Sequence, residues 1–381
     1  VEKTGELGGN LRNIKFVPTG EDPEKELKAL IKRVSKHKKI EVHLNTQVAD
    51  AHGYIGNFES TLVSPEAETV VNHGVAIIAT GGVEYKPKEY MYGSPGVMTQ
   101  FELEAKLHEG YKPDSVVMIQ CVGSRCDERT YCSRVCCTGA VTNALKVKEA
   151  NPDADIYVLY KDMRTYGFKE DYYRAAADKG VVFIRYTDED KPVVEAKGGL
   201  KVTVTDPVLK EKVELPADAV VLAAAVLPQE DNAKLAGIYK VPLSKDGFFL
   251  EAHVKLRPLD FATDGVYICG TAHSPKEVAE SLAQARGAAS RAGIPMAKGR
   301  LKTAAITSVV DETKCSGCGT CIELCAYNAI TKNERGLAQV TSAVCKGCGV
   351  CGASCPERAI TMRHFTNEEL EAQGLAALKE A

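Results

Sequence analysis

The sequence CSGCGTCIELC at residues 315–325 recurs, nineteen residues further on, as CKGCGVCGASCP at residues 345–356. Both stretches have the cysteine spacing C-x2-C-x2-C-x3-C. Between the cysteines stand small residues that permit positive φ and let backbone amides approach the sulfurs, namely Gly317, Gly319, Gly347 and Gly349. One motif is therefore written twice, and we expect the two copies to form a single module.

The doubled spacing is typical of bacterial-type ferredoxins, in which three cysteines of one copy and the fourth of the other hold each [4Fe-4S] cubane. We therefore predict two interleaved ligand sets, which are Cys315, Cys318, Cys321 and Cys355 for one cluster and Cys345, Cys348, Cys351 and Cys325 for the other. Disulfides and zinc are the alternatives, but disulfides suit small secreted domains and zinc sites usually have a longer gap between CxxC pairs. Ala326 follows Cys325 where proline is usual, so we expect a local adjustment there.

Composition sets the class of protein. A chain of 381 residues that is 44% hydrophobic and 26% charged is globular and long enough for two to four domains. The net charge of −3 provides no field for nucleic acid, and no run of eighteen apolar residues could span a bilayer. Fourteen cysteines, most of them in two clusters, indicate metal ligation under reducing conditions. We expect a soluble, cytoplasmic protein with no nucleic-acid partner and no transmembrane segment.

The first residues, VEKTGELGGNL, are similar to the end of the second strand of a Rossmann unit, where an acid binds a ribose hydroxyl. On this interpretation Glu2, Gly8 and Gly9 contact a dinucleotide; alternatively, Glu2 is a solvated terminal residue. The phosphate-binding glycine loop should lie about twenty residues upstream of the acid. We therefore predict that the sequence is an N-terminally truncated fragment.

Three further elements are expected in this first segment. Asp22-Pro23 should begin a helix, because Asp caps the free amides and proline is tolerated at the first helical position. Residues 40–48 should form a strand, and VAIIATGG at residues 75–82 a buried strand ending in glycines. In flavoproteins with two dinucleotide domains, such an ending passes close to the flavin nucleotide, which suggests the contacts Ala79, Thr80, Gly81 and Gly82. A plain strand-to-loop glycine pair is the alternative interpretation.

A second Rossmann-like unit begins with a strand at residues 115–120, a helix from about residue 139 to 149 and a strand at residues 155–160. Its first turn, CVGSRCDERTYCSRVCC at residues 121–137, carries cysteines where a dinucleotide phosphate would sit. Four thiolates suffice for a [4Fe-4S] cluster. We predict a third cluster on Cys121, Cys132, Cys136 and Cys137, with Cys126 as the spare; a redox-silent loop or a zinc site is the alternative.

The stretches QCVGSR (120–125) and YCSRVCC (131–137), together with the doubled ferredoxin motif and the flavoprotein frame, resemble the A subunit of heterodisulfide reductase. The resemblance extends from Glu2 to about residue 373. It implies an α/β, thioredoxin-reductase-like flavoprotein with two dinucleotide-binding domains and a C-terminal ferredoxin domain. The implied cofactors are FAD and three [4Fe-4S] clusters. The corresponding segments are 1–106 and 229–300 for FAD, 107–228 for the inserted domain with the cysteine loop, and 301–381 for the ferredoxin domain and a C-terminal helix.

The resemblance also implies flavin contacts in the strand, glycine turn and long helix of residues 262–293. The loop expected to face the isoalloxazine contains Gly270, Thr271, Ala272, Ser274 and Pro275, with His273 and Lys276 as residues that tune the flavin. Simple exposure is the alternative for His273. Relatives often have Gly-Asp where this chain has Gly270-Thr271, so no acidic contact to the ribitol is expected.

The predicted function is that of an electron-transfer oxidoreductase subunit in an anaerobe, which distributes, and in some complexes bifurcates, electrons between FAD and the clusters. Implied partners are the B and C subunits of the heterodisulfide reductase type, a hydrogenase- or dehydrogenase-type donor, ferredoxin, and a second copy in a homodimer. One alternative is a self-contained NAD(P)H-dependent flavin and iron–sulfur reductase of an organic substrate such as an enoyl compound. The other is a scaffold whose metals only stabilise folding.

Overall fold

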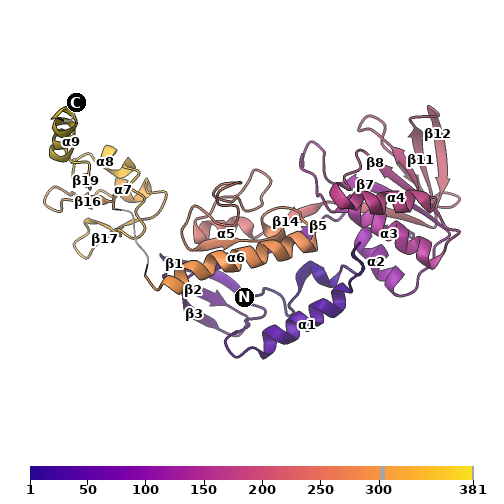
Figure 1. Ribbon diagram of the computed structural model, residues 1–381, viewed down its shortest axis with the longest axis horizontal. Coiled ribbons are helices and arrows are strands. Elements are labelled where there is room, and N and C mark those ends of the chain that lie inside the picture. The colour runs from indigo at the N-terminus through magenta and orange to yellow at the C-terminus, as the bar shows by residue number, and fades with distance from the viewer. Residues whose placement is uncertain (301–304, 380–381) are drawn as a thin grey trace.

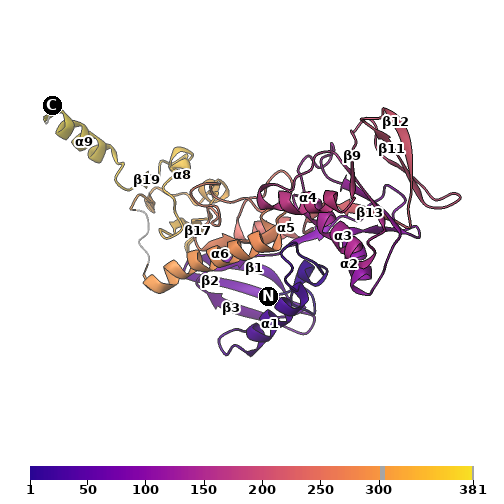
Figure 2. The same cartoon turned by 45° about the vertical axis from the view of Figure 1, so that its right-hand side comes forward.

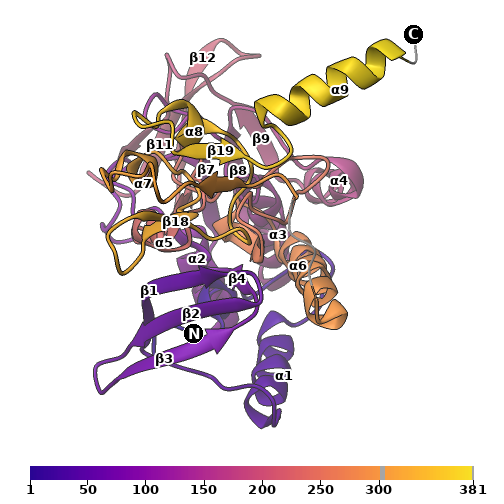
Figure 3. The same cartoon turned by 90° about the vertical axis from the view of Figure 1, so that its left-hand side faces the viewer.

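The computed structural model of the protein describes residues 1–300 and 305–379. Three parts lie in a row (Figure 1). The central part contains the long helix α6 and the β1–β3 sheet, a five-stranded sheet with its helices lies at one end, and a small cysteine-rich module lies at the other. Helix α9 projects away from the module (Figures 2 and 3).

The central part is assembled from both ends of the first 300 residues. Helix α1 begins at Pro23 because the Asp22 side chain accepts the Lys25 amide at 3.0 Å, which confirms the predicted helix start. The elements of the central part are η1 (Gly9–Arg12), α1 (Pro23–Lys36), β1 (Gln47–Tyr54), β2 (Asn57–Val63), β3 (Glu68–His73), β4 (Ala76–Ile78), β5 (Gly82–Glu84), β14 (Val226–Pro228), α5 (Asn232–Tyr239), β15 (Val266–Ile268), η3 (Gly270–Ala272) and α6 (Val278–Lys298).

Two strand predictions in the central part are wrong in extent. β1 begins only at Gln47, because residues 41–46 make isolated bonds to the chain start, such as Glu2 N–H to His43 O at 2.8 Å, instead of a continuous ladder. The apolar run at residues 75–82 yields the three-residue strand β4, which pairs in parallel with β15. Ile77 is 42% exposed, so this run is not covered on both faces.

The inserted part is built on a parallel sheet with strand order β6-β13-β7-β8-β9. Residues 116–119 of β7 are fully buried, as expected for the middle of a parallel sheet covered on both faces. The predicted βαβ unit is confirmed. The elements of the inserted part are β6 (Val97–Thr99), α2 (Gln100–His108), β7 (Ser115–Val122), α3 (Cys136–Ala150), β8 (Asp155–Tyr160), η2 (Gly167–Lys169), α4 (Glu170–Asp178), β9 (Val182–Arg185), β10 (Val193–Glu195), β11 (Lys201–Asp206), β12 (Glu211–Pro216) and β13 (Ala219–Ala224).

After β13, the chain returns to the central part through β14, which pairs antiparallel with β5. The third part consists of two similar halves with one short antiparallel pair each, β16 with β19 and β17 with β18. Its elements are β16 (Ser308–Val310), α7 (Thr320–Glu323), β17 (Ile330–Lys332), β18 (Ala338–Val340), α8 (Val350–Ala353), β19 (Ile360–Met362) and α9 (Asn367–Lys379). The boundary expected between residues 300 and 301 adjoins residues 301–304, which lie outside the described residues.

The predicted C-terminal helix is present as α9, which begins at Asn367. Thr366 and Glu369 bond reciprocally, with the Glu369 amide donating to Thr366 Oγ1 at 3.3 Å and the Thr366 amide to Glu369 Oε2 at 3.0 Å. None of the described helices is long and apolar enough to cross a membrane.

Glu104 on α2 provides a test of how the chain start is attached to the inserted part. Burial raises the pKa of its carboxyl from 4.5 to about 7, although the Lys15 amide donates to it at 2.8 Å. Below pH 4.5 the Glu104 carboxyl is protonated in both the folded and the unfolded chain. Between pH 4.5 and about 7 it is ionised in the unfolded chain but still protonated in the folded one. The free energy of unfolding should therefore fall by about 3 kcal/mol across this window, at about 1.4 kcal/mol per unit of pKa.

Glu104→Gln should abolish this loss. Chemical denaturation of both proteins at about pH 5 and about pH 8 measures it, with groups common to both proteins cancelling in the comparison. An identical pH dependence in wild type and variant would contradict the assignment.

Candidate metal centres and flavin site

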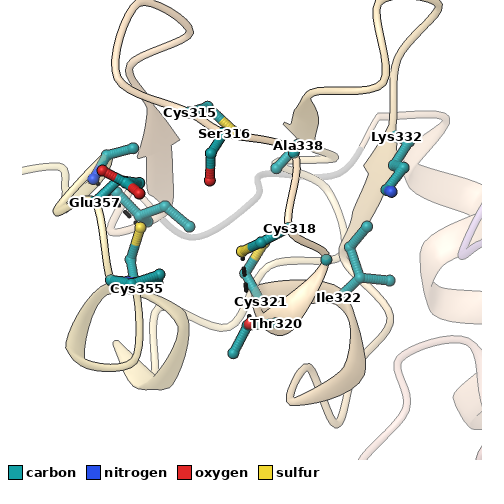
Figure 4. A pocket seen from close by; sticks show the side chains of 15 residues that line it. Cys315, Ser316, Cys318, Thr320, Cys321, Ile322, Lys332, Ala338, Cys355 and Glu357 are labelled. Carbon is teal, nitrogen blue, oxygen red and sulfur yellow. Dashed lines mark hydrogen bonds between the residues drawn. The ribbon is translucent and has the colours of Figure 1, made fainter.

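The first predicted ferredoxin ligand set lies around one cavity. Cys315 and Cys318 line it from the loop that leads into α7, Cys321 from α7 itself, and Cys355 from the loop after α8 (Figure 4). The cavity opens to solvent, and its empty space together with that opening is about 390 Å³. Ala338 and Ile360 complete its apolar wall. We call this cavity with its four cysteines site I.

The second set is arranged in the same way. Cys345, Cys348 and Cys351 precede or begin α8 and line a cavity of about 320 Å³, and Cys325 joins them from the loop after α7. We call this arrangement site II. Cys321 and Cys351 are 7% and 8% exposed and pack with Ile330 and Ile360, so both sites adjoin one small core.

Backbone amides point at the sulfurs in both halves of the module. The Ala329 amide donates to Cys325 Sγ at 3.2 Å, and the Ala359 amide donates to Cys355 Sγ at 3.3 Å. Donors of this kind stabilise thiolates and tune an attached cluster. Four cysteines, an apolar wall and amide donors together fit a [4Fe-4S] cubane at each site.

Among residues 1–300 and 305–379, no three His, Cys, Asp or Glu side chains converge closely enough to hold a single metal ion. Four sulfurs around a cubane are spread over its corners, so a cluster does not require them to meet at one point.

The third predicted set lies at the carboxyl end of β7. Cys121 belongs to this strand and has a positive φ of 61°, and Cys136 and Cys137 begin α3. Burial raises the pKa of the Cys121 thiol, and the nearby Cys137 and Cys132 raise it further. A hydrogen bond from Cys136 lowers the pKa of Cys137 to about 7, and the same bond and full burial raise the pKa of Cys136. The structure therefore groups these four thiols, which we call the loop site.

Cys126 lies apart, in a turn closed by backbone bonds of 3.1 Å in both directions with Arg129. The loop itself is held firmly, since Tyr131 donates to Val226 O at 2.8 Å and the Val226 amide donates to Ser133 Oγ at 3.0 Å. Arg125 contacts Asp162 at 2.6 Å, with a guanidinium nitrogen 3.9 Å from Cys121 Sγ.

Buried polar atoms beside the loop site lack partners. Gln120, Ser124, Thr138 and Thr165 are at most 4% exposed, and among the described residues the Gln120 side-chain amide and the three hydroxyls have no hydrogen-bond partner. Such orphan groups are costly unless something else bonds to them. Sulfide and thiolate sulfurs accept hydrogen bonds, so this shell fits a cluster better than an empty thiol pocket.

The predicted flavin contacts come from segments that the fold brings together. Asn10 donates to Gly82 O at 2.6 Å, and a Cβ at Gly82 would lie 3.7 Å from Thr271 Cβ. Lys3 donates to Gln229 at 3.0 Å, and Gln229 in turn donates to Thr80 O at 3.2 Å. Residues near Gly8 and Gly9, the turn at residues 79–82 and the loop at residues 270–276 are thereby joined.

Individual residues in this group differ. Glu2 turns its carboxylate onto Thr4, accepting from its amide and its hydroxyl at 2.8 Å. A Cβ at Gly8 would meet Leu27, whereas the spaces beside Gly9 and Gly270 are open, as close approach of a cofactor requires. Ala79 is exposed, but Ala272 is fully buried in the core with Phe249 and Phe261. Room for a flavin nucleotide therefore lies beside Gly9, Ala79 and Gly270, whereas Glu2, Gly8 and Ala272 are occupied by the protein's own contacts.

His273 is part of a network that fixes its proton. The Gly270 amide donates to Gln284 Oε1 at 3.0 Å, so the Gln284 amide nitrogen faces His273 Nδ1 at 3.2 Å. Nδ1 must then accept, and Nε2–H donates to Glu251 Oε2 at 2.8 Å. His273 is thus neither free nor simply exposed, which differs from the alternative drawn from the sequence.

Lys276 is buried and donates to Gly270 O and Ser274 O at 2.9 Å and to Ser274 Oγ at 3.1 Å. Burial and, to a smaller extent, the nearby Arg134 lower the pKa of its ammonium to about 8. The lysine therefore shapes the loop at residues 270–276 and places a titratable cation there.

Arg134 connects the loop site to this loop. Its amide donates to Cys132 Sγ at 3.3 Å, and its guanidinium donates to Pro275 O at 3.2 Å and to Glu280 at 2.8 Å. A second ion pair, Lys169 with Glu277 at 2.6 Å, crosses the same junction. The candidate cluster and the candidate flavin loop are thus one side chain apart.

Sequence reasoning missed several of these residues. Glu251 and Gln284 join His273 only through the fold, and no local pattern marks them. Asn10 and Gln229 lie next to predicted contacts but carry no motif of their own. Arg134 is recognisable in the sequence only as a charge beside the cysteines, because its bond to Pro275 depends on the packing of two distant segments.

Comparison with known proteins agrees with this architecture. The family of 4Fe-4S dicluster domains matches residues 308–362. An iron-sulfur A subunit of the CoB-CoM heterodisulfide reductase of Methanopyrus kandleri is 41% identical over 336 residues, which covers 81% of this chain and 50% of that protein. The A subunit of the H(2):CoB-CoM heterodisulfide,ferredoxin reductase of Methanothermobacter thermautotrophicus is 42% identical, with 82% and 50% covered. The chain thus spans about half the length of these relatives.

Among solved structures, the thioredoxin reductase of T. acidophilum aligns with a TM-score of 0.54 at 14% identity, over 78% of this chain and 89% of that one. The thioredoxin reductase of Lactococcus lactis aligns with a TM-score of 0.53 at 14% identity, over 78% and 90%. At this identity the likeness concerns the fold, and it confirms the predicted thioredoxin-reductase-like architecture with a ferredoxin module.

A pair of glycines at site I tests whether tight backbone packing is needed to keep the cysteines in place. Gly317 and Gly319 both have positive φ, so alanine at either adds about 1–2 kcal/mol of strain. Only at Gly317 would the new Cβ collide with backbone, 2.7 Å from Gly336 O; at Gly319 the space is open. Gly317→Ala should lose one cluster, about four irons per chain, whereas Gly319→Ala should keep its iron. Anaerobic iron and sulfide analysis measures both, and equal retention would refute the role of this contact.

Proposed function

Over the four fifths of its length that the curated relatives match, the chain belongs to the family of heterodisulfide reductase A subunits, and we propose that it is the FAD- and iron–sulfur-containing electron-transfer subunit of a heterodisulfide-reductase-like complex. The proposed cofactors are one FAD and three [4Fe-4S] clusters, at site I, at site II and at the loop site. The activity is that of an oxidoreductase whose chemistry on the final substrate is completed on other subunits.

The observation that carries this proposal is the bridge made by Arg134. Its amide bonds to a thiol of the loop site and its side chain bonds to the loop at residues 270–276. A redox centre held against a flavin in this way is positioned to exchange electrons with it. When bound, the flavin supplies two-electron and one-electron chemistry, and each cubane supplies one-electron transfer.

The position of the loop site supports the same conclusion. In a nicotinamide-binding domain, the turn after the first strand and the N-terminus of the next helix bind the pyrophosphate. Here Cys121 and the pair Cys136 and Cys137 take up that turn and helix start. A self-contained NAD(P)H-dependent reductase would need this place for its nucleotide.

The proposal extends to partners, which the relatives' names suggest. We propose association with B- and C-type subunits of heterodisulfide reductase, with a hydrogenase- or dehydrogenase-type donor and with ferredoxin, in a cytoplasmic complex built on a homodimer. Division of an electron pair between a high-potential and a low-potential acceptor belongs to the same proposal.

Cofactor analysis of anaerobically purified protein tests the assignment directly. We expect about twelve irons, about twelve sulfides and one FAD per chain, and three iron–sulfur signals in an EPR-monitored redox titration. Zinc or disulfides at these cysteines would refute the proposal. Clusters that support folding but never change oxidation state would favour the scaffold.

Anaerobic mixing with NADH separates the two enzymatic alternatives. If the cysteine loop has replaced the nicotinamide site, the flavin of the isolated protein should bleach slowly or not at all with NADH, yet be reduced by dithionite. Prompt bleaching by NADH would favour the self-contained reductase instead.

Lys276 should tune the flavin through its charge. A cation near the ring stabilises the anionic reduced flavin. Lys276→Met should therefore lower the flavin midpoint potential by about 30 mV, which corresponds to a tenfold change in the equilibrium constant of a two-electron reduction. Because burial lowers the pKa of Lys276 to about 8, the charge is present below about pH 8 and lost above it. The difference between wild type and variant should therefore shrink as the pH rises past 8.

Spectroelectrochemistry at several pH values measures this shift. Lys298→Met, at the exposed far end of α6, is the matched control and should leave the potential unchanged. A potential that is equal in all three proteins at about pH 7 would exclude a role for Lys276 in tuning the flavin.

A further inference from the structure

The two halves of the ferredoxin module correspond residue by residue, with an offset of thirty positions. Cys315 corresponds to Cys345, and Cys321 to Cys351. The matching extends to the hydrogen bonds, since the amides of Ala329 and Ala359 donate to the fourth cysteines at 3.2 and 3.3 Å. Any difference between sites I and II must therefore come from positions where the halves differ.

One such difference lies within the walls of the sites. Ser308 on β16 lines site II, whereas its counterpart, Ala338 on β18, lines site I. Both are buried, with 4% and 5% exposed. Ser308 Oγ lies 3.1 Å from Cys351 Sγ and its amide donates to Cys345 Sγ at 3.4 Å. The alanine at site I has no hydroxyl to offer its cysteines.

We propose that the Ser308 hydroxyl donates to the Cys351 sulfur and makes site II the higher-potential cluster of the module, with Ala338 leaving site I the lower. This inference deepens the proposed function, because it rests on a cluster at each site and concerns the order in which the two accept an electron. Ser308 acts only through its bond to Cys351 and does not itself touch the reacting atoms of a substrate.

The direction of the bond follows from the chemistry of ligation. A cysteine that ligates iron is a thiolate and has no proton to donate, so the hydroxyl must be the donor. The hydroxyl has one proton and two other sulfur neighbours, Met362 Sδ at 3.3 Å and Cys345 Sγ at 3.8 Å. A charged thiolate is a stronger acceptor than a thioether, and Cys351 Sγ is the nearest of the three sulfurs, so the proton goes to Cys351.

The sign follows from charge. Accepting an electron adds one negative charge to a cluster and its thiolates, and a donor to the sulfur stabilises that charge more in the reduced form. The bond is enclosed, since Ser308 and Cys351 are 4% and 8% exposed, and a buried bond is electrostatically stronger than one in water. Ser308 therefore raises the potential of site II.

Site I has a hydroxyl of its own. It would raise the potential of site I and so narrow the difference in potential between the two sites. Thr320 Oγ1 lies 3.5 Å from Cys318 Sγ, and the corresponding residue in site II is Val350. This contact is longer, and Cys318 is exposed, so water can replace it. The buried, shorter bond at site II should outweigh it, and Thr320→Val supplies a matched control for hydroxyl removal.

The test is an EPR-monitored redox titration of the full chain, purified anaerobically, for wild type, Ser308→Ala, Ala338→Ser and Thr320→Val. Ser308→Ala should lower the higher of the two ferredoxin potentials, with about a tenfold change in the reduction equilibrium, or 59 mV for one electron. Ala338→Ser should raise the lower potential in return. Thr320→Val should shift the lower potential by less than Ser308→Ala shifts the higher one, and the loop-site signal should stay fixed in all four proteins.

Iron and sulfide analysis of each protein keeps two failures apart. If wild type lacks the ferredoxin clusters, the proposed function fails. If all four proteins hold full iron but Ser308→Ala leaves the higher potential in place, or moves the lower one, the tuning role is overturned while the cluster assignment stands. Should Ser308→Ala lose iron, Ala338→Ser decides alone, and an unmoved lower potential in that variant overturns the proposal.

Discussion

The structure depends on a single electrostatic constraint, the gathering of four thiol groups at each of three sites, with at least one of the four buried at every site. Four sulfurs line each ferredoxin cavity and four more cluster behind β7, where burial and mutual proximity raise the pKa of Cys121 and Cys136. If these groups stayed protonated, they would leave poorly packed polar cavities. If they were thiolates, their negative charges would repel one another and would require a cation. The proposed iron–sulfur clusters would resolve this conflict, and the surrounding amides and orphan hydroxyls would supply the remaining hydrogen bonds.

The same constraint explains why the loop site lies where it does. The carboxyl edge of a parallel sheet, followed by the start of a helix, attracts negative charge through free amides and the helix dipole. Phosphates use this place in nucleotide-binding proteins, and a thiolate-ligated cluster is also an anion. The proposed cluster would therefore suit the same electrostatic environment as a phosphate. Gly123, whose added Cβ would lie 2.3 Å from the Tyr85 ring, shows how closely the loop is packed.

Much of this architecture could be predicted from the sequence because its signals are local. The ferredoxin motif fixes its own ligand sets by spacing, and β7, α3 and β8 follow from apolar runs of the right length. The predicted strand at residues 40–48 is wrong because β propensity does not supply a partner, and residues 41–46 have only scattered bonds to the chain start. The network of Glu251, His273 and Gln284 could not be predicted, since it joins residues that only the return of the chain through β14 brings together.

The asymmetry of the ferredoxin module gains meaning from the way the module meets the rest of the chain. Lys346, beside Cys345 and in the wall of site II, forms an ion pair with Asp264, which precedes β15 in the central part. Site II is therefore the ferredoxin site nearer to this contact with the central part. On the proposed function, an electron that enters the module through this contact meets site II first, and the Ser308 hydroxyl holds it there more tightly. Site I has alanine at the same position and therefore the lower potential. Electron transfer from site II to site I is then unfavourable by itself, and it proceeds only if an acceptor oxidises site I.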